Sequence, residues 1–139
     1  DGAWWQHAGM EITHVNPGSL HANPAFSQGV LVRGDHDTLV IGGQNGTDAS
    51  GAIVDGGAAA QTEQALRNVL AVLAEAGADQ TNVTRLAIYL DPTVSVDEGF
   101  GASMRVWGPH PTAITVLHVA KLGRPGALVE IEALAALPR

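Results

Sequence analysis

Cysteine is absent from the 139 residues of this chain. Its absence excludes disulfide bonds, thiolate metal sites and cysteine nucleophiles. Aromatic residues are few, and aliphatic residues and alanine dominate a hydrophobic fraction that is typical of a globular protein. No apolar run approaches the roughly 18 residues that a membrane span needs. A basic segment followed by an apolar leader is also missing, so we expect a cytoplasmic protein without a membrane partner.

Basic residues are also scarce. The chain has 7 Lys and Arg against 14 Asp and Glu, a net charge of −7, and its basic residues are scattered from Arg33 to Arg139. Nucleic-acid binding normally requires a cluster of positive charge, because neutralised phosphates release counterions and drive association. The sequence therefore disfavours an RNA or DNA partner, although folding could still bring separate basic residues together.

The length of the chain fits one ordinary domain with a sizeable core. Residues 1–9 look detached from it, because Trp4, Trp5 and His7 follow no periodicity and Met10 begins a stretch that reads like a natural start. We favour a cloning remnant or a mis-assigned extension for residues 1–9. The paired tryptophans could alternatively pack on a neighbouring subunit. Residues 10–139 are then predicted to form a single domain.

Apolar periodicity predicts the secondary structure from Phe26 onward. Leu66, Val69, Leu70 and Leu73 form an apolar stripe, which indicates a helix over 58–76 that ends at Gly77. Ser95 and Glu98 are spaced as a capping box and predict a second helix from 95 to about 107. Strands are predicted over 29–33, 38–41, 83–90, 114–120 and 128–134, with a small strand at 52–54 and a hairpin turn at 34–37.

This order of elements favours a two-layer α+β domain. The simplest packing places both helices on one face of a single mixed sheet. The other face of the sheet would then be exposed and apolar, which usually indicates oligomerisation.

Six segments of the chain resemble conserved segments of the Rid (reactive intermediate deaminase, YjgF-like) family and occur in the same order. Phe26 to Val30 is similar to the family's Tyr-x-Gln-(Gly/Ala)-Val, and Gly42 to Gln44 to its Ser-Gly-Gln. Residues 60–68 resemble Ala-Gln-Thr-x-Gln-Ala-Leu-x-Asn, 86–90 resemble Val-Tyr-Leu, 110–115 resemble His-Pro-Pro-Ala-Arg-Ser, and 128–133 match Leu-Val-Glu-Ile-Glu-Ala. The resemblance implies a chorismate-mutase-like α+β fold, a homotrimer whose sheets line a central barrel, and ligand clefts between subunits.

The resemblance also implies where a ligand binds and how the site is altered. Ile114 stands in place of the arginine whose planar fork clamps a substrate carboxylate in catalytic family members. Phe26 replaces a tyrosine and loses its hydroxyl, and Gly42 replaces a serine. Gly43 would allow a ligand to approach the backbone closely, and Gln44 and Asn45 follow at the strand end, where turn formation explains the same residues about as well. Hydrolysis of 2-imino acids by the usual route is therefore doubtful, and a less anionic ligand is expected.

Glu130 is the one catalytic candidate that the resemblance retains. Its family counterpart is thought to position or activate the water that attacks an imine carbon, which requires a carboxylate within hydrogen-bond reach of that water. Strand alternation places Glu130 and Glu132 on one face, with Val129, Ile131 and Ala133 on the other. For Glu132 an exposed or interfacial position is the preferred interpretation.

The six histidines show no spacing typical of a metal site, so we expect neither a metal nor a cofactor. His110 lies beside the turn that the resemblance places at the cleft. It could carry protons, although a hydrogen bond that stabilises the turn is the simpler interpretation.

Three functions remain open. The first is an enzyme that hydrolyses a small neutral imine, enamine or related carbonyl compound, with Glu130 directing water. The second is a non-catalytic small-molecule binder. The third, disfavoured by the acidic charge, is the ribonuclease activity attributed to some family members.

Overall fold

The computed structural model describes residues 9–139. The prediction that residues 1–9 form an extension therefore falls almost entirely outside the described part. The elements, in chain order, are β1 (Glu11–Val15), β2 (Gly29–Arg33), β3 (His36–Gln44), α2 (Gly57–Glu75), a short 3-10 helix (Gln80–Asn82), β4 (Val83–Leu90), α3 (Val96–Trp107), β5 (Ala113–His118) and β6 (Val129–Pro138).

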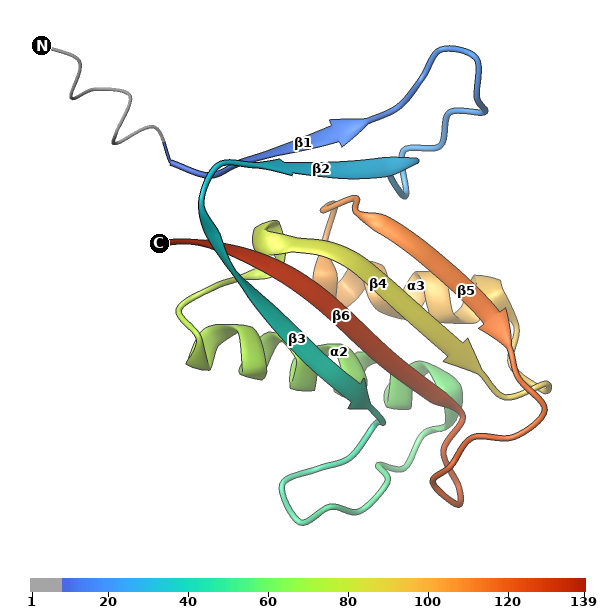
Figure 1. Ribbon diagram of the computed structural model, residues 1–139. Coiled ribbons are helices and arrows are strands. Elements are labelled where there is room, and N and C mark those ends of the chain that lie inside the picture. Colours follow the sequence, from blue (N-terminus) through green and yellow to red (C-terminus); the bar gives the residue numbers. More distant parts are fainter. Residues whose placement is uncertain (1–8) are drawn as a thin grey trace, which may run out of the picture.

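A four-stranded mixed sheet forms one layer, and the two helices form the other. The strand order is β3-β6-β4-β5. β6 runs antiparallel to both β3 and β4, whereas β4 and β5 are parallel and are connected through α3. Figure 1 shows α2 and α3 behind the same face of the sheet. The predicted two-layer α+β arrangement with both helices on one face is confirmed.

The core lies between α2 and the sheet. Leu66, Val69 and Leu73 of α2 are at most 1% exposed, and they belong to one cluster with Val129 and Ile131 of β6. The apolar stripe of the sequence thus faces the apolar side of the central strand β6. Gly77, with φ of 79°, follows the end of the helix in the left-handed conformation that glycine adopts without strain.

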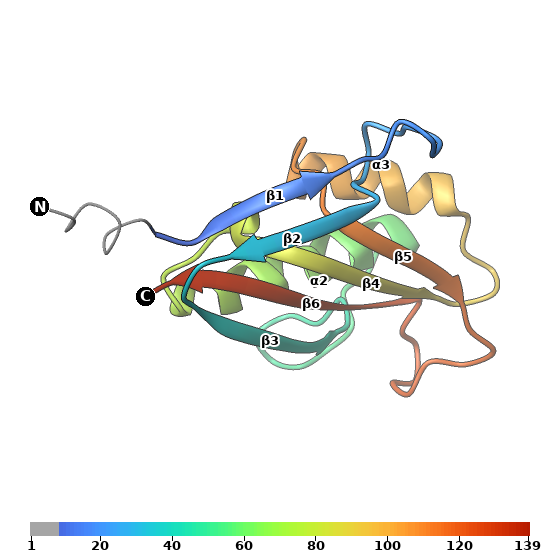
Figure 2. The same ribbon diagram turned by 45° about the horizontal axis from the view of Figure 1, so that its top comes forward.

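The start of the domain differs from the prediction. No strand was predicted before Phe26, yet β1 pairs with β2 along five residues to form a separate two-stranded ribbon. In consequence 34–37 is not a hairpin turn, because β2 pairs with β1 and β3 pairs with β6. The chain turns at Gly34, whose φ is 85°, from one sheet into the other. The ribbon lies at the end of the sheet where β4 begins (Figure 1; Figure 2).

The remaining elements agree closely with prediction. Ser95 caps α3 by accepting a hydrogen bond from the backbone N–H of Glu98 at 3.2 Å, which is the N-cap half of the predicted capping box. β3 and β6 extend further than predicted, and the predicted strand at 52–54 is reduced to a single bridge between Thr47 and Ile53. Within residues 9–139, no helix combines the length and apolarity that crossing a membrane would require.

Candidate functional site

The predicted site residues fall into two groups on opposite faces of the sheet. Strand pairing aligns Ile114 of β5 with Leu86 of β4, and Glu130 of β6 with Tyr89 of β4. Because neighbouring residues of a strand point to opposite faces, Leu86 and Tyr89 are on different faces. Strand spacing and rise place the Cα atoms of Ile114 and Glu130 roughly 14 Å apart in one subunit.

The first group surrounds a cavity of ≈ 840 Å³ on the helix side, which we call the α3 pocket. Phe26 and Ile114 both line it. The other apolar walls come from α3, β4, β5 and β6: Val96, Phe100, Met104, Trp107, Leu86, Ile88, Leu90, Val116 and Ile131, with Leu66 of α2. The pocket thus joins two of the residues that the resemblance assigns to ligand binding.

The α3 walls were not identified from the sequence. Val96, Phe100 and Met104 recur every fourth residue along α3, and they are 48%, 51% and 43% exposed. Such a stripe normally packs into a core. Here it borders the pocket, and the spacing in the sequence could have indicated an apolar groove.

Few polar groups reach the α3 pocket. Asp97 and His110 are the titratable residues among those that line it, and no lysine or arginine of residues 9–139 does so. Thr62 of α2 also lines the pocket, and it is 3% exposed. Within the described chain its Oγ1 is a buried side-chain atom with no hydrogen-bond partner, a situation that costs roughly 1–3 kcal/mol.

The second group, which we call the Glu130 cluster, consists of Gly43, Asn45 and Glu130 on the outer face. Asn45 Nδ2 donates to the carbonyl of Val129 at 2.9 Å and to Glu130 Oε1 at 3.3 Å. A Cβ atom on Gly43 would lie 2.2 Å from Glu130 Oε2, so only glycine leaves the carboxylate its present position. These contacts hold one carboxylate oxygen of Glu130 in place, and Glu130 is half-buried.

The other predicted site residues contribute less to either group. A Cβ on Gly42 would have no neighbour within 4 Å, so its backbone has open space beside it. The side chain of Gln44 donates to the carbonyl of Gly42 at 3.1 Å and so stays within its own strand. Asn45, which follows Gln44 at this strand end and was predicted beside it, is the residue whose side chain contacts Glu130.

Glu132 lies on the same face as Glu130 and has a defined partner. The hydroxyl of Tyr89 donates a hydrogen bond to its Oε1. This hydrogen bond is the main reason that the pKa of Tyr89 is raised above its usual value, with desolvation contributing less. The predicted alternation is confirmed, since Val129, Ile131 and Ala133 are at most 3% exposed while both glutamates are half-buried.

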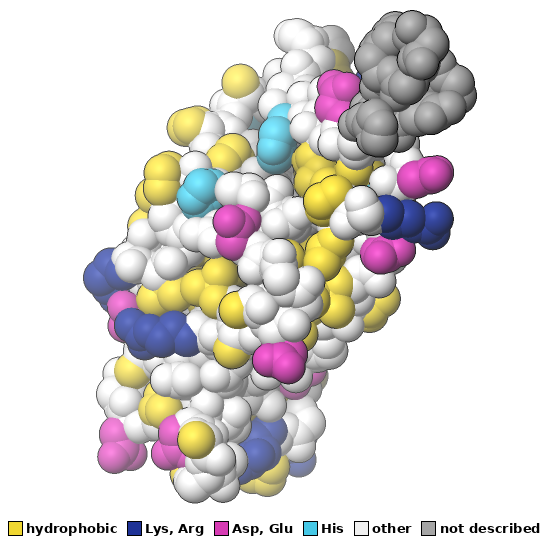
Figure 3. Space-filling model, turned by 90° about the vertical axis from the view of Figure 1, so that its left-hand side faces the viewer, with side chains coloured by type: hydrophobic (Ala, Val, Ile, Leu, Met, Phe, Trp, Pro, Cys, Tyr) yellow, Lys and Arg dark blue, Asp and Glu magenta, His cyan; other side chains and the backbone are white. Residues whose placement is uncertain are grey.

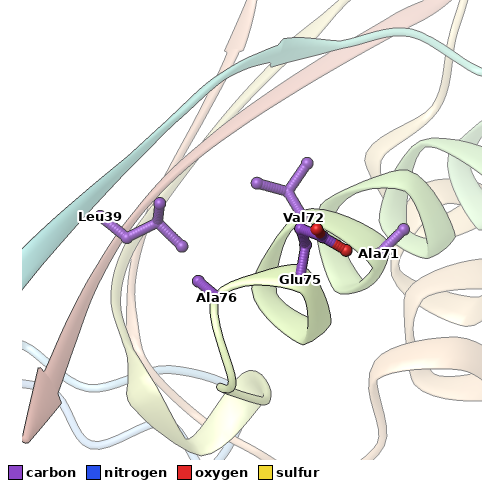
Figure 4. Close-up of a pocket in the computed structure, with 5 residues that line it drawn as sticks. All are labelled: Leu39, Ala71, Val72, Glu75 and Ala76. Carbon is purple, nitrogen blue, oxygen red and sulfur yellow. The ribbon is translucent and has the colours of Figure 1, made fainter.

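A second hollow lies elsewhere, between β3 and the C-terminal end of α2. It is open, measures ≈ 440 Å³, and is lined by Leu39, Ala71, Val72, Glu75 and Ala76 (Figure 4). None of the predicted site residues borders it. Within the described part of the chain, no group of three or more histidine or acidic side chains is placed to hold a metal ion.

Comparison with known proteins decides the family. The sequence matches the model of the family described as Endoribonuclease L-PSP over residues 18–137. The chain belongs to this family. A Rid family protein from Yersinia pestis, described as of unknown function, has a structure that matches with a TM-score of 0.80 at 32% identity, covering 91% of this chain and 98% of that one.

Relatives of known activity are similar over most of the chain. The bovine 2-iminobutanoate/2-iminopropanoate deaminase is 38% identical over 114 residues, which are 79% of this chain and 78% of the bovine protein. The human protein of the same name is 36% identical over 114 residues, with the same coverage of both chains. RidA from an Antarctic Psychrobacter has a similar structure, with a TM-score of 0.67 at 26% identity over 84% of this chain and 92% of that one. The predicted Rid-family fold is therefore confirmed.

Proposed function

We propose that this Rid family member is a homotrimer that binds a small molecule without a carboxylate in the α3 pocket and hydrolyses it as a neutral imine or enamine. The relatives named as imine deaminases support imine chemistry. One observation supports a substrate that differs from theirs: Ile114 lines a pocket with mostly apolar walls and no lysine or arginine from residues 9–139.

Electrostatics support a ligand without a carboxylate. Moving a carboxylate from water into an apolar pocket is costly unless a cation or several donors compensate it. The α3 pocket offers Asp97, which would repel a carboxylate, and the chain as a whole has a net charge of −7. An uncharged C=N or C=O group needs far less compensation.

In this proposal, Glu130 of one subunit directs the water that attacks a ligand in the α3 pocket of a neighbouring subunit. Its position on the opposite face of the sheet keeps it away from the α3 pocket of its own chain. The outer face also carries exposed apolar side chains, with Val40 at 71% and Leu117 at 50%, which association would bury. A trimer with sites between subunits meets both requirements.

Replacing Ile114 by arginine tests the substrate class. If the pocket binds the ligand, the I114R variant should gain hydrolysis of 2-iminobutanoate and lose affinity for a neutral ketone such as acetophenone. Thr115→Arg is the matched control, because it adds the same charge at the next residue on the opposite face. Equal behaviour of the two variants would contradict a ligand site at Ile114.

Mixing variants tests the shared site. Glu130→Ala and Ile114→Asp should each be inactive, since one lacks the water-directing carboxylate and the other has a charged pocket. Refolded together, random trimers should recover about a quarter of wild-type activity if each site uses two subunits. No recovery would place both groups in one subunit. A monomer in sedimentation would remove the basis for the trimer.

A non-catalytic binder is the second candidate, and the altered pocket is the observation that favours it. The Glu130→Ala variant separates the two functions. An enzyme should lose turnover of a neutral imine such as benzaldimine, whereas a binder should show no turnover in either form and at most a change in affinity.

The family's endoribonuclease description gives no comparable support to RNA cleavage. Arg105 pairs with Glu63 and Arg139 with Asp37, each at 3.0 Å, and Arg124 donates to the carbonyl of Gly51. On the face in Figure 3, the basic side chains are separated by acidic and hydrophobic ones. Evidence for this function would be RNA cleavage that becomes faster at low salt and persists through further purification.

A further inference from the structure

His110 differs from the other histidines that the structure describes. The rings of His14, His36 and His118 are hydrogen-bonded to the Ser27 hydroxyl, the Gly34 carbonyl and the Val94 carbonyl, at 2.7, 2.9 and 2.7 Å. Within residues 9–139, the rings of His21 and His110 have no hydrogen-bonded partner. Of these two, only His110 lines the α3 pocket.

The main-chain atoms of His110, and not its ring, make the hydrogen bonds of this turn. Its N–H donates to the carbonyl of Gly108 at 2.9 Å, and its carbonyl accepts from Trp107 Nε1 at 3.3 Å. Both partners belong to the end of α3 or its cap. The residue is therefore held at the pocket by its main chain, and its half-buried imidazole is left for other contacts.

A carboxylate lies within electrostatic range of this imidazole. The pKa of Asp79 is lowered, chiefly by hydrogen bonds from the hydroxyl and backbone N–H of Thr81, and in smaller part by the positive charge of His110. Asp79 is thus ionised at neutral pH, and its negative charge lies near the imidazole of His110. The other titratable residue at the pocket is Asp97, in the first turn of α3.

We propose that His110 transfers protons during hydrolysis of the imine bound in the α3 pocket. This inference rests on the proposed function and adds a second group to it, since Glu130 directs water and His110 moves the proton. A positioned imidazole suits this work because it exchanges protons readily near neutral pH.

The proposed reaction is balanced without an oxidant or reductant. Water adds to the imine carbon: the new C–O bond forms, the C=N electron pair moves to nitrogen, and His110 accepts the water proton and passes it to that nitrogen. The resulting carbinolamine then collapses. His110 accepts the hydroxyl proton as C=O forms and delivers it to nitrogen, whose bond to carbon breaks. The products are a carbonyl compound and ammonia.

The test compares His110→Gln with His21→Gln as a matched control, using benzaldimine generated in situ from benzylamine by a flavin amine oxidase. Binding of acetophenone, a stable neutral ketone, is measured separately by calorimetry. We expect H110Q to bind acetophenone within about twofold of wild type and to lose roughly 10²–10⁴-fold in kcat/KM, the usual contribution of general acid–base catalysis. H21Q should match wild type in both.

The pH profile supplies a readout that a structural role would not move. Wild type should lose activity as pH falls through the range where imidazoles become protonated, and H110Q should lack this dependence. A variant H110Q that keeps the wild-type rate and profile overturns the inference. If the wild type binds acetophenone but does not hydrolyse benzaldimine, the inference about His110 is overturned, whereas ligand binding at the pocket still stands. Failure to bind acetophenone overturns both proposals.

Discussion

Gly43→Ala is the most direct test of how the Glu130 cluster is built. A Cβ at this position would meet Oε2, Cδ and Cγ of Glu130 at 2.2, 2.9 and 3.0 Å, so the glutamate side chain would have to move. The end of a flexible side chain can do so without a shift of the backbone. Gly42→Ala, one residue earlier, is the control because its Cβ would meet nothing within 4 Å.

The expected cost follows from the contacts that would change. Moving Glu130 breaks its hydrogen bond with Asn45, worth about 1 kcal/mol. A strained rotamer adds roughly 0.5–1.5 kcal/mol. Alanine in a strand returns roughly 0.5–1 kcal/mol relative to glycine. G43A should therefore be less stable than wild type by about 1 kcal/mol, whereas G42A should equal or exceed wild type.

The assay is denaturant unfolding of both variants, together with benzaldimine turnover. G43A should also lose most of the turnover that Glu130→Ala loses, because the carboxylate no longer occupies its position, and G42A should keep it. Equal stabilities of G43A and G42A would refute the overlap. Lower stability of G43A with full turnover would show that the present position of Glu130 is not the one that matters for function.

Two further predictions use other contacts. Tyr89 is the only tyrosine of the chain, so absorbance at 295 nm reports its ionisation alone; because its pKa is raised, its midpoint should lie above 10, and Glu132→Gln should lower it. The stabilisation from this hydrogen bond should be complete below the unfolded pKa and lost as pH rises through the folded one, so a midpoint unchanged in E132Q would contradict it. Gly46→Ala should cost roughly 1–3 kcal/mol in unfolding experiments, because its Cβ would lie 2.5 Å from Cα of Gln61 in α2 and backbone cannot yield. A stability of G46A equal to that of G42A would refute this.

The fold could be predicted wherever one residue pattern corresponded to one buried surface. The stripe from Leu66 to Leu73 and the alternation from Val129 to Ala133 each face the core, and both were read correctly. β1 was missed because Glu11 to Val15 is short and largely exposed. Its β-branched Ile12, Thr13 and Val15 were the available signal. Because β1 was not predicted, the prediction paired β2 with β3 through a turn at 34–37.

The candidate site was harder to predict, because its geometry depends on register between strands distant in sequence. Alternation within β6 correctly placed Glu130 on the outer face. It carried no information on Ile114, whose face is fixed by pairing of β5 with β4 and of β4 with β6. A shift of one residue in either ladder would have brought the two side chains to the same face.

The separation of the two groups bears on how such a site can change its substrate. Phe26 and Ile114, two of the three replacements inferred from the resemblance, line the α3 pocket, whereas Glu130 keeps its contacts with Asn45 on the other side of the sheet. β6 and β4 lie between the two groups, so a new side chain in the pocket need not disturb the carboxylate. Within one chain, a substitution in the α3 pocket and the position of the Glu130 carboxylate are therefore structurally independent. In the proposed trimer they would be coupled only where neighbouring subunits meet, and for that reason the mixed-variant experiment, rather than any single substitution, separates recognition from chemistry.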